Sequence, residues 1–218
     1  MPHTPMDLVK SSQRDSDHGD AFTPEWMVEA MLNLVQDESA RIGARFLEPA
    51  CGSGSGLAQV LRRKLASVDR KYGQSDLERR HFALLALMCL YGIEPRAQNV
   101  VECRAGLLRV LAGHLNLPMY HEVYRAASGV LTRNIVHGDA LERCTQSTPR
   151  FTFAEWRYVG GGKFQRRDFR FNNLIVPAGF DAVGTPGDDD AAPEFTPVRT
   201  YPPMTVAELA AAAPGAGG

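Results

Sequence analysis

With 218 residues, of which 44% are hydrophobic, the chain can bury one sizeable core but has little length left for a second domain. No apolar stretch approaches the length of a membrane span, and no segment of the signal-peptide kind opens the chain. We therefore expect a cytoplasmic protein with no membrane partner. The net charge of −1 conceals an asymmetry, because residues 181–218 hold six acids and one base, and the rest is mildly basic.

The chain shows no pattern of metal ligands or disulfides. Its six histidines form no pair at helical spacing, and its cysteines lack the spacing of metal sites or bridges. We expect no metal and four reduced thiols, which are Cys51, Cys89, Cys103 and Cys144.

A first helix is predicted near residue 24. Thr23 is a suitable N-cap and Pro24 a suitable first helical residue. An apolar stripe follows at helical spacing. It consists of Met27, Val28, Met31, Leu34 and Val35.

The most informative segment runs from Phe46 to Gly54, with the sequence Phe-Leu-Glu-Pro-Ala-Cys-Gly-Ser-Gly. It is typical of a buried strand that enters a tight turn, where Gly52 and Gly54 permit positive φ and a close approach of a ligand to the backbone. Apolar residues at helical spacing then predict a helix whose first amides face the same place. A purely structural turn between a strand and a helix remains an alternative.

The kind of ligand is narrowed by what this segment lacks. A dinucleotide site needs a third glycine where Leu57 stands, and the Gly-Lys-Ser/Thr of a phosphate loop does not occur. Glu48, just before the glycines, would repel a pyrophosphate but suits a ligand with a sulfonium and an ammonium group. S-adenosylmethionine has this charge pattern.

Two later runs also end in acids. In residues 90–95 the apolar run reaches Glu94, just before Pro95, and this acid could accept the ribose hydroxyls of a nucleoside. A helix over Asp76 to Met88 is predicted between the glycine turn and this run. Residues 134–141 contain Asp139, which could accept a hydrogen bond from an adenine amine.

These motifs resemble the amino-adenine DNA methyltransferases of restriction-modification systems, especially their short M subunits, from about His18 to Leu174. The resemblance implies an α/β fold of the Rossmann-like, doubly wound methyltransferase type, and S-adenosyl-L-methionine as cofactor. Because the tail begins where such a sheet would still add strands, we expect an incomplete sheet that is short, completed by a partner or finished by a hairpin. It further implies DNA as a partner, with a specificity or restriction subunit as a second. The family's Phe-Thr-Pro element, which closes over the methionine part of the cofactor, matches Phe22, Thr23 and Pro24. The cofactor site would comprise Phe22, Thr23, Pro24, Glu48, Pro49, Ala50, Cys51, Gly52, Ser53, Gly54, Glu94, Asp139 and Ala140.

The chain departs from this family at the catalytic loop. The Pro-Pro-aromatic motif that follows the family's fourth strand is missing, and the fourth apolar run ends in Glu155 and Trp156 instead. Trp156 could stack on an extruded base and Glu155 could accept its amine hydrogens, so both are catalytic candidates. The alternative is a strand whose tryptophan packs in the core and whose glutamate faces solvent.

A hairpin is predicted around Gly160-Gly161-Gly162, with Phe169 and Phe171 on one face of its second strand and Asp168 and Arg170 on the other. Its basic residues could follow a phosphate backbone or be solvated edge charges.

We expect a flexible N-terminus over 1–17, a methyltransferase-like domain over 18–176 and a flexible tail rich in Pro, Gly, Ala and Asp over 177–218. A short helix from Met204 to Ala213, capped by Thr205, is predicted in this tail. Three functions remain open: a DNA adenine methyltransferase or modification subunit, a non-catalytic cofactor-binding accessory subunit, and a methyltransferase acting on RNA or protein.

Overall fold

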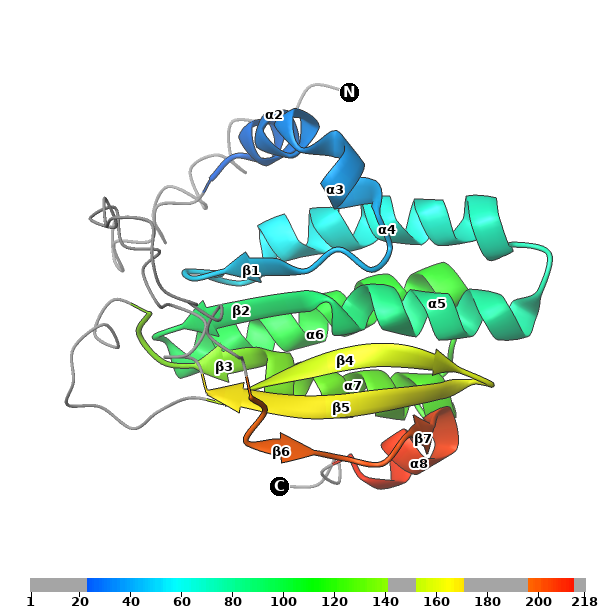
Figure 1. Cartoon of the computed structure of the whole chain (residues 1–218). Helices are drawn as coiled ribbons and strands as arrows, with labels where there is room; N and C mark the ends of the chain where they lie inside the picture. The colour runs from blue at the N-terminus through cyan, green and yellow to red at the C-terminus, as the bar shows by residue number, and fades with distance from the viewer. Residues whose placement is uncertain (1–22, 141–151, 171–195, 214–218) are drawn as a thin grey trace, which may run out of the picture.

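The computed structural model describes residues 23–140, 152–170 and 196–213, which form a mixed α/β structure (Figure 1). Within these ranges, no helix is both long and apolar enough to cross a bilayer. In chain order, the helices and strands are α2 (Glu25–Leu34), α3 (Gln36–Ala40), β1 (Phe46–Glu48), α4 (Ser55–Tyr72), α5 (Asp76–Met88), β2 (Leu90–Glu94), α6 (Ala97–Leu115), α7 (Glu122–Asn134), β3 (Ile135–His137), β4 (Thr152–Gly160), β5 (Lys163–Arg170), β6 (Arg199–Thr200), β7 (Met204–Thr205) and α8 (Val206–Ala211).

The predicted apolar runs around residues 46, 90 and 135 form a parallel three-stranded sheet in the order β1-β2-β3. Glu48 pairs with Gly92, and Glu94 pairs with His137, so the three strands end at one edge of the sheet. Parallel strands need long crossover connections, which α4 and α5 provide between β1 and β2, and α6 and α7 between β2 and β3.

Two helices continue directly into strands. Only Cys89 separates α5 from β2, and α7 passes into β3 without an intervening residue. The predicted bounds of α5 are confirmed, and Ser75 caps it by accepting from the N–H of Glu78.

Opposite faces of β2 pack against different layers. Leu90 belongs to the main core with α4 and α6, whereas Tyr91 and Ile93 pack with Phe153 of β4. The Tyr91 hydroxyl donates to the carbonyl of Ala154 at 2.9 Å, which fixes β4 over this face. An antiparallel hairpin thus covers the face of the sheet that lies opposite α6.

The hairpin itself is as predicted. Strands β4 and β5 pair antiparallel around Gly161 and Gly162, which have φ of 58° and 71°. Positive φ at both residues of a two-residue loop matches the twist of the strands, and glycine adopts it without steric cost. The fourth apolar run therefore does not extend the parallel sheet but belongs to a second sheet with β5, β6 and β7.

Part of the segment expected to be a flexible tail is folded. Strand β6 pairs with β5, and α8 packs on α7 with Val206, Leu209 and Ala210 buried. The predicted Thr205 cap is confirmed, since Thr205 and Glu208 form a capping box. The helix is shorter than the expected Met204 to Ala213, because α8 spans Val206–Ala211 and the two residues before it form β7.

The connection into β1 is held by a buried lysine. Lys64 has no exposed surface, and its Nζ donates to the carbonyls of Arg41, Ile42 and Ala44 at 2.6, 3.2 and 2.6 Å. All three ammonium donors are thereby satisfied, as burial of this group requires. Helix α4 is thus tied to the chain segment that enters the sheet.

Candidate functional site

The turn after β1 has the geometry that the sequence predicted. Gly52 and Gly54 have φ of 52° and 86°, and the N–H of Gly54 donates to the carbonyl of Cys51 at 2.8 Å. A Cβ on Gly54 would lie 2.5 Å from Cys103 Sγ, so the turn packs closely on α6 there. A Cβ on Gly52 would meet no atom within 4 Å. The turn is therefore tightly packed at Gly54 and open at Gly52.

Glu94 fixes this turn to the end of β2. Its carboxylate accepts from the N–H of Gly52 at 2.9 Å, from the N–H of Arg96 at 3.0 Å and from Asn99 Nδ2 at 3.2 Å. A carboxylate has about four lone-pair positions, so capacity for about one further donor remains. Glu94 is only 5% exposed, which limits its access to a ribose. It lies at the predicted site, but its described contacts are to the protein itself.

The carboxylate of Glu48, at the same edge of the sheet, has one oxygen without a hydrogen-bond partner among the described residues. It is half-buried and lies against the first turn of α4, where a Cβ on Gly56 would be 2.9 Å from Glu48 Oε1. Among the described residues, Oε2 is buried and has no hydrogen-bond partner. Burial raises the pKa of Glu48 from its ordinary 4.5 to about 7, and a hydrogen bond from the Leu57 backbone opposes this rise only in part. Near neutral pH the group can therefore carry either a proton or a negative charge.

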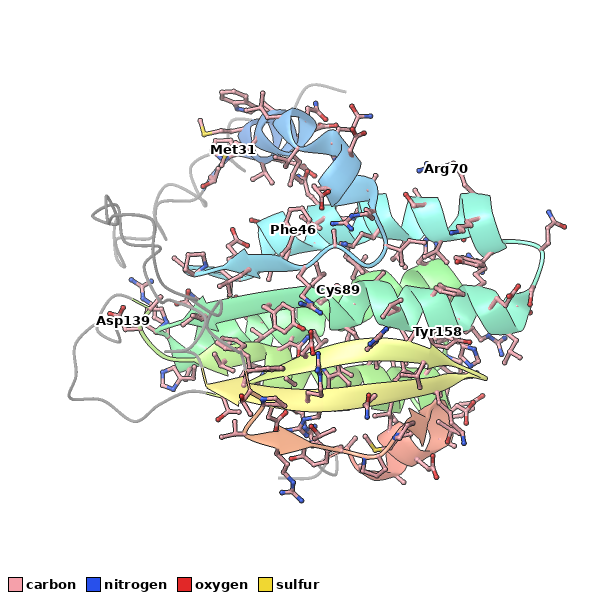
Figure 2. All side chains as sticks on the ribbon, viewed as in Figure 1. Met31, Phe46, Arg70, Cys89, Asp139 and Tyr158 are labelled. Carbon is pink, nitrogen blue, oxygen red and sulfur yellow. The ribbon has the colours of Figure 1, made fainter. Side chains whose placement is uncertain are left out.

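The chain after β3 reaches the same edge. The N–H of Gly138 donates to the carbonyl of Glu94 at 2.8 Å, which places the neighbouring Asp139 beside the end of β2. Figure 2 shows Asp139 beyond the strands, at the edge where β1 and β2 also end. Ala140 is half-buried and packs against the cluster formed by Tyr91, Ile93 and Phe153. The structure thus brings Asp139 to the site, whereas Ala140 contributes packing.

The other turn residues divide into exposed and buried positions. Pro49, Ala50 and Ser53 are exposed around the turn. Cys51 is 5% exposed, and its N–H donates to the carbonyl of Ile93 at 3.1 Å. A hydrogen bond with Cys103 and burial both raise the pKa of the Cys51 thiol, so it remains protonated. Cys51, which the resemblance assigned to the cofactor site, therefore packs inside the turn.

Helix α2 begins one residue later than predicted. Pro24, not Thr23, occupies the N-cap position and makes no side-chain cap hydrogen bond. The carbonyl of Glu25 accepts from Gln59 Nε2 at 3.5 Å, so the start of α2 lies over the first turns of α4. Thr23 and Pro24 are exposed there, and Phe22 lies outside the described residues.

The two catalytic candidates lie elsewhere. The Glu155 carboxylate pairs with Arg167 and with Arg45. Because Arg45 precedes β1 and the glycine turn follows it, Glu155 lies near the opposite end of this strand from the turn. Trp156 is 4% exposed, and its Nε1 donates to Asn134 Oδ1 at 2.9 Å. In this arrangement the indole ring has no open face for stacking on a base. The structure does not bring either side chain to the glycine turn.

The basic hairpin residues are largely neutralised. Arg166 pairs with Asp168 at 2.6 Å, and Arg167 pairs with Glu155. Asp168 is 6% exposed, and its carboxylate also accepts a hydrogen bond from the Tyr201 hydroxyl at 3.2 Å. This pairing favours the structural interpretation of the hairpin over a phosphate-binding one, while Phe171 lies outside the described residues.

Sequence patterns did not identify Asn99 and Asn134 as important residues. Asn99 orients Glu94, and Asn134 Nδ2 donates to the carbonyls of Met88 and Leu90, both at 3.0 Å. A single asparagine in a helical segment carries no local signal of a buried network. No group of three metal-ligating side chains occurs in the part of the chain that the structure describes.

Comparison with known proteins identifies no relative: no family model, no curated protein and no solved structure matches this chain.

Proposed function

We propose that this protein binds S-adenosyl-L-methionine at the glycine turn and is an adenine-directed DNA methyltransferase or its modification subunit. The observation that carries the proposal is the buried Oε2 of Glu48, which lacks a donor among the described residues. A buried unpaired acceptor is costly, so such a group calls for an explanation. An ammonium or sulfonium group beside the turn would provide one, because it would stabilise the ionised carboxylate.

The surrounding residues fit the rest of that ligand. Open space at Gly52 allows close approach to the backbone, and Asp139 lies at the same edge with a carboxylate suited to an exocyclic adenine amine. Glu94 would contribute mainly by holding Gly52, with one position left for a ribose hydroxyl. The acidic character of this edge disfavours a pyrophosphate and favours a cationic nucleoside.

When bound, the cofactor would supply an activated methyl group on its sulfonium. The protein then needs to align the acceptor amine and exclude water, which requires positioning more than acid-base chemistry. Acceptors near the amine hydrogens would assist as charge develops.

The position of β4 favours a second candidate, a cofactor-binding accessory subunit that does not transfer methyl groups. Glu155 is held by two arginines and Trp156 is buried, so neither is free to contact a base in this conformation. Such a subunit would keep the pocket and leave methyl transfer to a partner.

Transfer of a radiolabelled methyl group to unmethylated genomic DNA separates the two candidates. If DNA is labelled by the unmodified chain and by Trp156→Phe, but not when Glu48 is replaced, the result would support a methyltransferase whose acceptor site lies outside β4. Cofactor binding without transfer would support the accessory subunit. Transfer to RNA or protein alone would exclude the proposed DNA substrate.

A further inference from the structure

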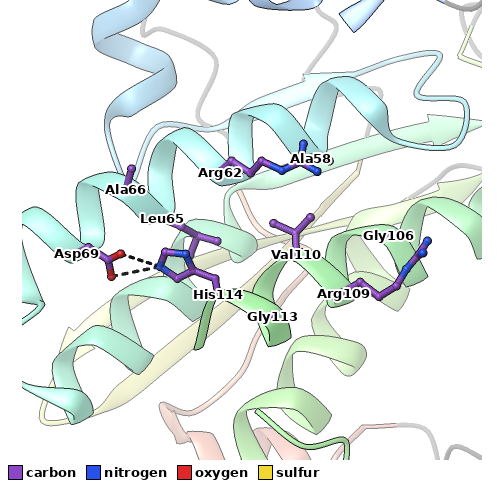
Figure 3. A pocket seen from close by; sticks show the side chains of 10 residues that line it. All are labelled: Ala58, Arg62, Leu65, Ala66, Asp69, Gly106, Arg109, Val110, Gly113 and His114. Atoms are coloured by element: carbon purple, nitrogen blue, oxygen red, sulfur yellow. Dashed lines mark hydrogen bonds and ion pairs between the residues drawn. The ribbon is translucent and has the colours of Figure 1, made fainter. Parts of the chain in front are cut away.

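A groove of about 700 Å³ runs between α4 and α6 (Figure 3). Leu65 and Val110 form its apolar floor. The space above that floor is open because the residues beside it on both helices are small. These residues are Ala58, Ala66, Gly106 and Gly113. The stretch of α4 from Ala58 to Asp69 gives the groove a length of about 16 Å at 1.5 Å per residue.

Two arginines flank this groove without acidic partners. Arg62 and Arg109 are exposed, one on each helix, and within the described ranges neither forms an ion pair. Asp69 at the far end already pairs with Arg79 and His114. The groove therefore combines an apolar floor with unpaired positive charge. An amphipathic helix with acidic residues satisfies both features, whereas a phosphate backbone would leave the floor uncovered.

Helix α2 has the complementary surface. Trp26, Met31 and Leu34 are 68%, 59% and 87% exposed, and Met31 projects from α2 in Figure 2. Leu32 is the residue of this helix that is buried. Glu25 and Glu29 lie one turn apart beside the apolar face, and their carboxylates form no ion pair in the described part of the chain. Ten residues make α2 about 15 Å long, which matches the groove.

The two surfaces are neighbours on one molecule. Arg63 of α4 donates to Asn33 Oδ1 of α2 at 2.6 Å, and Arg62, the next residue back, lines the groove. When two copies meet across a twofold axis, the groove of each copy can receive α2 of the other copy at the same time. Such a reciprocal arrangement forms a closed dimer.

We propose that the α4–α6 groove receives α2 of a second copy of this chain, in a reciprocal twofold dimer. Each copy would insert its exposed apolar α2 face between the partner's α4 and α6, and the acids of α2 would meet the groove arginines. None of these residues is itself among the proposed cofactor-binding residues, but Glu25 follows Pro24 directly, and the Cβ position of Gly106 lies 3.9 Å from the carbonyl oxygen of Ser53.

Charge reversal provides the test, with sedimentation velocity of the full chain over about a hundredfold range of concentration. The unmodified chain should dimerise. The groove variant Arg62→Glu/Arg109→Glu and the helix variant Glu25→Arg/Glu29→Arg should each weaken dimerisation by at least about tenfold, because like charges would then face each other. An equimolar mixture of the two variants should recover the dimer, since both interfaces of the mixed pair carry opposite charges.

Arg70→Glu is the matched control, because Arg70 is exposed on α4 one residue beyond Asp69 and does not itself line the groove (Figure 2). It should dimerise like the unmodified chain, and circular dichroism should show that every variant is folded. A monomer at all concentrations would overturn the proposal. So would a dimer that survives either reversal, or two folded monomeric variants that fail to pair when mixed.

Discussion

The carboxylate of Glu94 accepts a hydrogen bond from the backbone N–H of Gly52 at 2.9 Å, although the two residues are 42 positions apart. This contact joins the end of β2 to the turn that follows β1. Because the same carboxylate also accepts from Arg96 and Asn99, one side chain holds three parts of the candidate site together. The shape of the turn therefore depends on a residue outside it.

Replacing Glu94 with Ala should lower the free energy of unfolding by about 1–3 kcal/mol, because it leaves three donors without their acceptor. Glu94→Gln should lie between this variant and the unmodified chain, since an amide can accept through one end only. Urea unfolding measures both. Unmodified stability in Glu94→Ala would mean that the turn does not need this anchor.

Two glycine substitutions should have opposite effects. In Gly54→Ala, positive φ and a Cβ 2.5 Å from Cys103 Sγ should cost about 2 kcal/mol or more of stability. Gly113 lies in α6 with no atom within 4 Å of its Cβ position, so Gly113→Ala should be neutral or stabilising by up to about 1 kcal/mol. Thermal unfolding would show the difference, and equal melting temperatures for the two variants would contradict the described packing.

Glu48 should make stability depend on pH. Because its folded pKa of about 7 lies above the ordinary 4.5, the folded chain binds this proton more tightly than the unfolded chain does. The resulting stabilisation is complete below 4.5 and is lost as the pH rises through 7, by on the order of 2 kcal/mol. Glu48→Gln should lack this part of the profile. Identical pH profiles for both proteins would show that Glu48 is not desolvated.

Trp156 should behave as a core residue. Trp156→Phe removes the donor to Asn134 Oδ1 and should lower stability by about 1–3 kcal/mol, with cofactor affinity unchanged. In a Trp26→Phe background, the fluorescence of Trp156 should not respond to DNA. Quenching on addition of DNA would instead support the base-stacking role that the sequence suggested.

Local features of the fold could be predicted because neighbouring residues determine them. The bounds of α5, the positive φ of Gly52 and Gly54, and the Thr205 cap follow from short-range sterics and hydrogen bonding. The β4–β5 hairpin was also predicted, from the glycines between its two strands. That β4 lies over Tyr91 in a second sheet, and does not extend the parallel sheet, could not be predicted in this way, since an apolar run does not specify which sheet it joins.

In the candidate site, the positions of the acidic residues could be predicted but their contacts could not. Its three acids were found because each follows an apolar run, and parallel strands bring their carboxyl ends together. The sequence pattern does not specify which groups each carboxylate contacts. Glu94 is occupied by the protein, whereas Oε2 of Glu48 lacks a donor among the described residues.

Calorimetric titration of S-adenosyl-L-methionine into the folded chain, above pH 7, tests the central claim most directly. The account predicts saturable binding of one ligand per chain, weakened at least about tenfold in Glu48→Gln, because an ionised carboxylate beside the cation is lost. Trp156→Phe should bind as the unmodified chain does. Absence of binding to the folded, unmodified protein, or full affinity in Glu48→Gln, would contradict the account.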